Sequence, residues 1–155
     1  MLGVPPAVVL NNPKFPHNVG NVLRACYAFG INQLWWTGDR IMQEIGERLP
    51  REERLRRYID QVKLLNHEYT LREFKECTPV IVEVKSDGMN LVDFDHPDDA
   101  VYVFGPEDGS VSKGLRHTAR HFVYIPTHVC LNLGNAVATV LYDRLMKRIV
   151  SGKEQ

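Results

Sequence analysis

Short, largely apolar runs rich in β-branched and aromatic residues recur along the chain and constrain its fold more than any other feature. They occupy residues 7–10, 31–36, 79–84, 101–104 and 122–125. A continuous apolar run of this length is typical of a strand that is buried on both faces. Helical patterns separate several of these runs. The alternation predicts one α/β domain built on a parallel sheet.

The first and last predicted helices have the clearest patterns. An apolar stripe with the spacing of one helix face predicts a helix over residues 18–29, with Asn18 as its N-cap and Gly30 just beyond its end. A second stripe predicts a long helix over residues 133–150. We also expect helices over residues 51–59, 71–76 and 112–119 and a short strand over residues 62–65.

Length and composition limit the class of protein. The 155 residues fit a single domain spanning residues 1–155, with the polar tail 151–155 expected to be disordered. No apolar run is long enough to span a membrane, and no secretory signal is evident, so we expect a cytoplasmic protein. Three cysteines without a close pair indicate reduced thiols and no metal site.

Three polar loops follow predicted strands, at the edge where open α/β sheets bind ligands. The first contains Asn18 and Arg24, the second Gly105 and Glu107, and the third leads from Ile125 into the last helix. Each loop also has an ordinary explanation, as a cap, a solvated arginine or a turn. Gly134 lies early in a helix, where glycine costs about 1 kcal/mol relative to alanine, which indicates close packing against a backbone or a ligand.

Taken together, the loops resemble the three motifs of the SPOUT superfamily, in its TrmH-like branch. The matching residues are Asn18, Gly20 and Arg24, then Gly105 and Glu107, then Ile125, Pro126 and Asn132. The resemblance covers residues 7–148. Cys130 and Gly134 depart from it, because serine is usual or frequent at these places.

The resemblance implies an RNA 2′-O-ribose methyltransferase that converts S-adenosylmethionine to S-adenosylhomocysteine. It implies helices on both faces of the sheet, a C-terminal trefoil knot, and a homodimer formed through the first and last helices. The implied catalytic residues are Arg24, Asn18, Glu107 and Asn132. The implied cofactor-binding residues are Val82, Gly105, Ile125, Cys130 and Leu133. Because arginine rarely loses its proton, we expect Arg24 to stabilise the developing alkoxide and to hold an RNA phosphate.

The net charge of zero gives no overall attraction to RNA, so any RNA-binding surface must be local. Two basic segments are candidates, represented by Arg54 with Arg57 and by Arg116 with Arg120. We expect a small structured RNA such as tRNA as the substrate. Three alternatives stay open: methylation of ribosomal RNA, a catalytically silent RNA-binding dimer of the same fold, and a flavodoxin-like protein that binds a small ligand.

Overall fold

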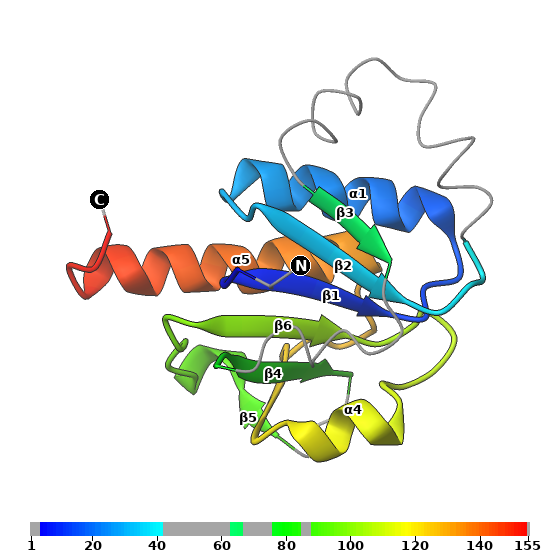
Figure 1. The fold of residues 1–155 in the computed structure, drawn as a ribbon. Helices are drawn as coiled ribbons and strands as arrows, with labels where there is room; N and C mark the ends of the chain where they lie inside the picture. The colour runs from blue at the N-terminus through cyan, green and yellow to red at the C-terminus, as the bar shows by residue number, and fades with distance from the viewer. Residues whose placement is uncertain (1–3, 42–62, 67–75, 85–87, 155) are drawn as a thin grey trace.

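The computed structural model describes residues 4–41, 63–66, 76–84 and 88–154. Seven parallel strands form one sheet in the order β3-β2-β1-β6-β4-β7-β5 (Figure 1). The strands are β1 (Ala7–Asn11), β2 (Gln33–Thr37), β3 (Lys63–Asn66), β4 (Thr78–Glu83), β5 (Met89–Asn90), β6 (Ala100–Phe104) and β7 (His121–Tyr124). The prediction of a parallel α/β sheet is confirmed.

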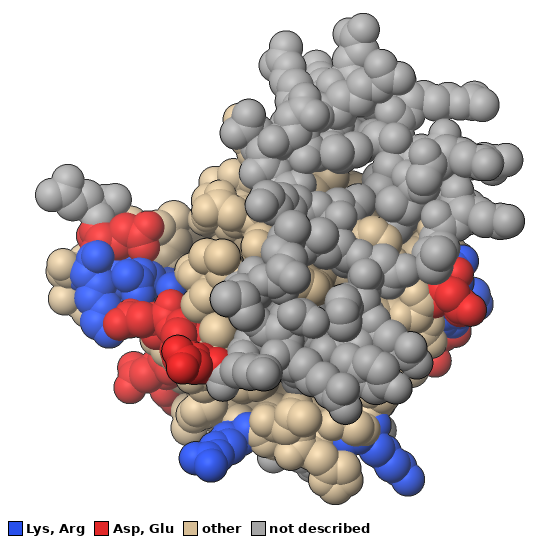
Figure 2. Space-filling view, in the orientation of Figure 1, with Lys and Arg blue, Asp and Glu red and all other residues tan. Residues whose placement is uncertain are grey.

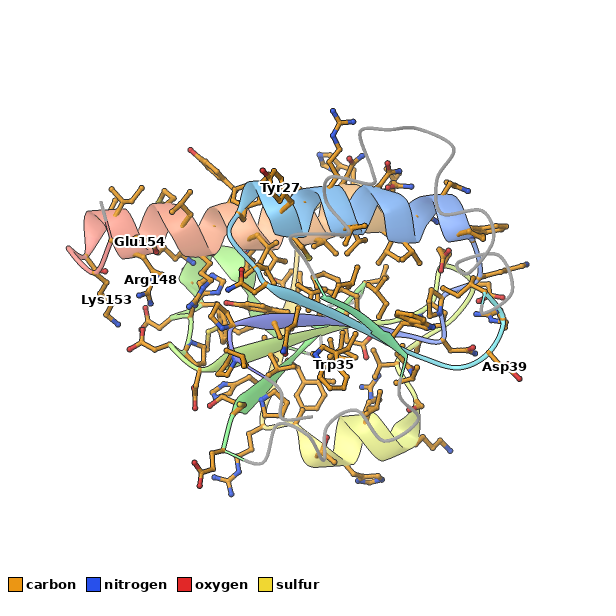
Figure 3. The ribbon with its side chains drawn as sticks, turned by 45° about the horizontal axis from the view of Figure 1, so that its top comes forward. Tyr27, Trp35, Asp39, Arg148, Lys153 and Glu154 are labelled. Atoms are coloured by element: carbon orange, nitrogen blue, oxygen red, sulfur yellow. The ribbon has the colours of Figure 1, made fainter. Side chains whose placement is uncertain are left out.

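Helices cover both faces of this sheet. On one face α1 (Pro16–Ala28) lies beside α5 (Leu133–Val150), and on the other lies α4 (Lys113–Thr118) (Figure 3). A short 3₁₀ helix, η2 (Leu91–Asp93), follows β5. The helices predicted over residues 51–59 and most of 71–76 lie outside the described residues.

Two apolar cores explain why the strand sequences are apolar without interruption. Along β1, Val8 and Leu10 pack into the core beneath α1 and α5, whereas Ala7 and Val9 pack into the core beneath α4. Every residue of β1 is buried, so no position on this central strand faces solvent. Successive side chains of a strand point to opposite faces, and here both faces are covered.

The prediction that Asn18 caps the first helix is wrong. The helix α1 begins two residues earlier, at Pro16, and its N-cap residue is Phe15, which provides no side-chain cap. Proline is favoured in the first helical position because it lacks the N–H group that would be unpaired there. Asn18 is therefore already inside the first turn, and its side chain is used elsewhere.

The C-terminal segment continues past α5 as a hydrogen-bonded turn. The backbone N–H of Lys153 donates to Arg148 O at 2.8 Å, and the Glu154 carboxylate accepts from Arg148 Nε at 2.9 Å. Basic and acidic side chains therefore mix at this end of the molecule (Figure 2). Within the described ranges, no helix combines the length and hydropathy needed to cross a bilayer.

Candidate active site

The carboxyl ends of the central strands meet at one edge of the sheet, and the loops leaving this edge surround a pocket. Figure 1 shows the strand arrows pointing to the side where α1 begins. The pocket has a volume of about 610 Å³, which is within the usual range for small-molecule sites. It is lined by the start of α1, the end of β4, the loop after β6 and the segment between β7 and α5.

Glu107, in the loop after β6, holds the loop between β1 and α1. Its Oε1 accepts from the backbone N–H of Lys14 at 3.1 Å, and its Oε2 accepts from the backbone N–H of Phe15 at 2.9 Å. Oε2 also accepts from Asn18 Nδ2 at 2.9 Å. One carboxylate thus connects two loops that lie about ninety residues apart in the sequence.

These hydrogen bonds determine the charge state of Glu107. Partial burial by itself raises the pKa of this carboxyl, but the hydrogen bonds from Asn18 and from backbone N–H groups outweigh it and leave the pKa below its ordinary value. Glu107 is therefore ionised near neutral pH, and its acceptor sites are largely occupied. Both facts make it a positioning residue rather than a general base.

Asn18 extends the cluster from Glu107 to the start of α5. Asn18 is 3% exposed, and its Oδ1 accepts from Asn132 Nδ2 at 3.0 Å. Asn132 in turn caps α5, because its Oδ1 accepts from the backbone N–H of Gly134 at 2.9 Å. We call Glu107, Asn18 and Asn132 the polar triad. The structure thus brings together three of the four predicted catalytic residues.

The five predicted cofactor-binding residues all line the pocket: Val82, Gly105, Ile125, Cys130 and Leu133. Three of them are aliphatic, which suits the apolar parts of S-adenosylmethionine. Gly105 lies close to the chain that follows it, because a Cβ atom there would be 3.0 Å from Val111 N. The size of the pocket and its mixture of aliphatic and polar residues fit this cofactor.

Arg24, the fourth predicted catalytic residue, does not line the pocket. It is exposed on α1, two turns beyond His17 on the same face of the helix, and His17 does line the pocket. No described residue gives Arg24 an ion-pair or hydrogen-bond partner. Within one chain, the described structure leaves Arg24 separate from the polar triad.

The predicted RNA-binding arginines have different surroundings. Arg116 pairs with Glu83, a residue of the pocket lining, at 2.5 Å, and its guanidinium lies 5.6 Å from the centre of the Phe122 ring. Arg120 is exposed. Arg54 and Arg57 lie outside the described residues.

An ion pair beside the pocket, between Arg40 and Asp108 and here called the clamp, was not predicted from the sequence. Arg40, just after β2, donates to both carboxylate oxygens of Asp108, at 2.8 and 3.0 Å, and also to Asn12 O. The hydrogen bond from Arg40 holds the pKa of Asp108 below its ordinary value. The sequence around Arg40 contains no motif that would indicate a role for it. Arg40 and Asp108 come together only through the fold.

Comparison with known proteins identifies the family. A model of the SpoU rRNA Methylase family matches residues 5–142. The fold is similar to that of the A. aeolicus TrmH/SpoU tRNA modifying enzyme, with a TM-score of 0.78, 23% identity, and coverage of 95% of this chain and 77% of that one. No curated protein gives a significant match.

Two further solved structures share the fold. The SpoU methyltransferase AviRb from Streptomyces viridochromogenes, in complex with the cofactor AdoMet, has a TM-score of 0.71 at 20% identity, and the match covers 93% of this chain and 60% of AviRb. A putative RNA methyltransferase from Bacillus anthracis has a TM-score of 0.69 at 22% identity, with coverage of 96% and 98%. AdoMet is S-adenosylmethionine, so the predicted cofactor is confirmed for the family. Because the family model matches most of its length, the chain belongs to the SpoU rRNA Methylase family, whose members are RNA methyltransferases.

Proposed function

We propose that the protein transfers a methyl group from S-adenosylmethionine to a ribose 2′-hydroxyl of RNA, with tRNA as the substrate. The observation that carries this proposal is the polar triad beside an aliphatic pocket. The aliphatic part of the lining accommodates the cofactor, and the triad fixes the loops around the place where the hydroxyl must enter. Holding two reactants in place in this way is worth up to roughly 7–11 kcal/mol in well-oriented systems.

The reaction forms a bond between the ribose oxygen and the methyl carbon and breaks the bond between that carbon and sulfur. The cofactor supplies the methyl group and leaves as S-adenosylhomocysteine. The hydroxyl must also lose its proton. Glu107 is an unsuitable acceptor, because its hydrogen bonds lower its pKa. We therefore assign the proton to an RNA phosphate or to water, and the stabilisation of the alkoxide to Arg24.

We further propose that Arg24 acts in a homodimer, at the pocket of the second copy. Arg24 lies outside its own pocket, whereas α1 and α5 present exposed apolar side chains that a partner could cover. Tyr142, Met146 and Ile149 form such a stripe along α5 and are 60%, 38% and 46% exposed. A pair of chains related by a two-fold axis would complete two equal sites.

The strand order supports the expected trefoil knot in the C-terminal part. The last strand, β7, lies between β4 and β5, although both precede it in sequence. After β7 the chain turns back to form α5 on the face that carries α1. Lys147 of α5 then donates to Leu91 O and Phe94 O, which places α5 directly over the connection between β5 and β6.

The choice of tRNA rests on a relative, because the similar A. aeolicus protein is described as a tRNA modifying enzyme. Ribosomal RNA is the second candidate, because the description of the family names it. Arg120 is exposed on the described surface and is our candidate for a contact with RNA phosphate.

A methyl-transfer assay tests this proposal. Purified protein is incubated with labelled S-adenosylmethionine and either total tRNA or ribosomal RNA, and the RNA is then digested to nucleosides. We expect label in 2′-O-methylated nucleosides from tRNA. Label on a base would contradict the ribose assignment. Cofactor binding without transfer to either RNA would favour the silent RNA-binding dimer.

Two variants connect the activity to the polar triad. Glu107→Gln replaces one carboxylate oxygen by an amide N–H₂ group, which cannot accept the hydrogen bonds that Lys14, Phe15 and Asn18 donate. Because the loops around the site then lose their fixed position, we expect the transfer rate to fall by about a hundredfold. Asp39→Asn is the matched control, since Asp39 is an exposed carboxylate after β2 that does not line the pocket (Figure 3). We expect it to change the rate by less than about twofold.

A further inference from the structure

An exposed aromatic pair lies on the pocket lining next to the polar triad. Phe15 and His17, from the start of α1, both line the pocket, and their ring centres are 5.6 Å apart with the planes inclined by 32°. Phe15 is 40% exposed. The predicted cofactor-binding residues come from other segments, namely the ends of β4, β6 and β7 and the start of α5.

The backbone under this pair is held in place although the rings are exposed. The N–H of Phe15 donates to Glu107, and its carbonyl accepts from the backbone N–H of Asn18 at 3.1 Å. One residue earlier, the N–H of Lys14 is held by the same carboxylate. An exposed aromatic ring on a fixed backbone is ready to bind without further ordering, which lowers the entropic cost of binding.

A positive charge lies over the Phe15 ring. Lys14 Nζ is 5.3 Å from the centre of the Phe15 ring, and the Lys14 side chain is 47% exposed. Its carboxylate neighbour, Asp108, is 3.8 Å away and is already bound by Arg40 at 2.8 Å. Lys14 is thus available to a phosphate next to the aromatic pair.

We propose that Phe15 and His17 form a stacking platform for one unpaired base of the RNA substrate, with Lys14 beside its phosphate. This inference rests on the proposed function and specifies its substrate. Proteins recognise unpaired RNA bases by stacking them on aromatic side chains, whereas bases inside an A-form duplex are not accessible in this way. The substrate nucleotide therefore lies in a loop or is turned out of its helix.

The test measures binding of a short fluorescein-labelled single-stranded RNA of mixed sequence, in the presence of S-adenosylhomocysteine. The same RNA annealed to its complement is the reference. We expect the wild type to prefer the single strand. Phe15→Leu keeps an apolar side chain without a ring, and we expect it to weaken single-strand binding by roughly 5- to 100-fold, as for a lost base–aromatic stack. Phe15→Trp keeps a stacking surface and should retain the binding.

Affinity for S-adenosylhomocysteine distinguishes failure of the inference from failure of the proposed function. We expect Phe15→Leu to leave this affinity and the melting temperature unchanged. An equal loss of cofactor affinity would assign the ring to the cofactor instead and overturn the inference. Unchanged RNA binding by Phe15→Leu, or no preference of the wild type for single strands, would also overturn it. A wild type that does not bind S-adenosylhomocysteine would contradict the proposed function itself.

Discussion

Asn18 shows both what the sequence reveals about single residues and what it conceals. Its motif predicted it as a residue of the site, and the structure places it in the pocket lining, in contact with Glu107 and Asn132. Its expected role as a helix cap was wrong, since Pro16 begins α1 earlier. Local rules describe where a helix can begin, but they do not include partners that are about ninety residues or more away, and such partners determine the position of this side chain.

Arg24 is the residue whose role most needs a direct test. Arg24→Lys keeps the positive charge but removes the planar fork that can hold two oxygens at once. We expect the methyl-transfer rate to fall by roughly a hundredfold, the scale of one lost donor to a developing oxyanion. Affinity for S-adenosylhomocysteine and the melting temperature serve as controls and should not change. Full activity of Arg24→Lys would show that charge alone is sufficient.

At the scale of elements, the contact between α1 and α5 depends on Gly134. A Cβ atom at this position would lie 2.8 Å from the Cβ of Asn21 on α1. The sequence pointed to such a contact, because glycine is unfavourable in a helix unless packing requires it. The partner could not be named from the sequence, and the structure identifies it as α1.

Two glycine substitutions separate packing from helix propensity. Gly134→Ala should push α5 away from α1 and lower the free energy of unfolding by about 1–2 kcal/mol, because overpacking outweighs the gain in propensity. Gly114→Ala in α4 is the matched control, since among the described residues no atom beyond its chain neighbours and its own helix backbone lies within 4 Å of its Cβ position. It should be neutral or stabilising by up to about 1 kcal/mol. Urea unfolding measures both, and equal effects of the two substitutions would refute the packing argument.

A buried histidine fastens α5 to the connection between β5 and β6. The His96 side chain is 2% exposed, and its Nδ1 and Nε2 lie 2.7 Å from the Tyr102 hydroxyl and 2.6 Å from Asp143 Oδ2. Burial is the largest single effect and lowers the pKa of His96, while contact with the Asp143 carboxylate acts in the opposite direction. Lys147 and Arg144, which are also close, lower it further.

This lowered pKa predicts a dependence of stability on pH. Below about pH 6.5, the ordinary pKa of histidine, His96 takes up a proton in the unfolded chain more readily than in the folded protein. The free energy of unfolding is therefore highest above that pH and decreases as the pH falls toward the pKa of His96 in the folded protein. We expect urea unfolding of the wild type to show this loss between about pH 7 and pH 5. In His96→Gln, which cannot titrate, the loss should be smaller. An identical pH dependence of the two proteins would show that His96 does not contribute.

At the scale of the whole molecule, the parallel sheet could be predicted because β1, β2 and β6 are buried along their whole length and are therefore largely apolar. The two-residue strand β5 could not be predicted, since so short a segment carries no pattern. The clamp of Arg40 and Asp108 was also missed, because nothing in the sequence relates residues that lie 68 positions apart. The three polar loops could be predicted to lie together, since they follow strands whose ends meet at one edge, and residues of all three line the pocket.

The central claim is that Arg24 and the polar triad act in one methyl-transfer site, built from two copies of the chain. The direct test pairs an Arg24→Lys chain with a Glu107→Gln chain, co-expressed with different tags and purified as a mixed pair. If Arg24 serves the pocket of its partner, one of the two sites in each pair is intact, and the pair should recover about half of the wild-type rate. If Arg24 serves its own pocket, both sites carry a defect. A mixed pair no more active than the two variants alone would contradict the account.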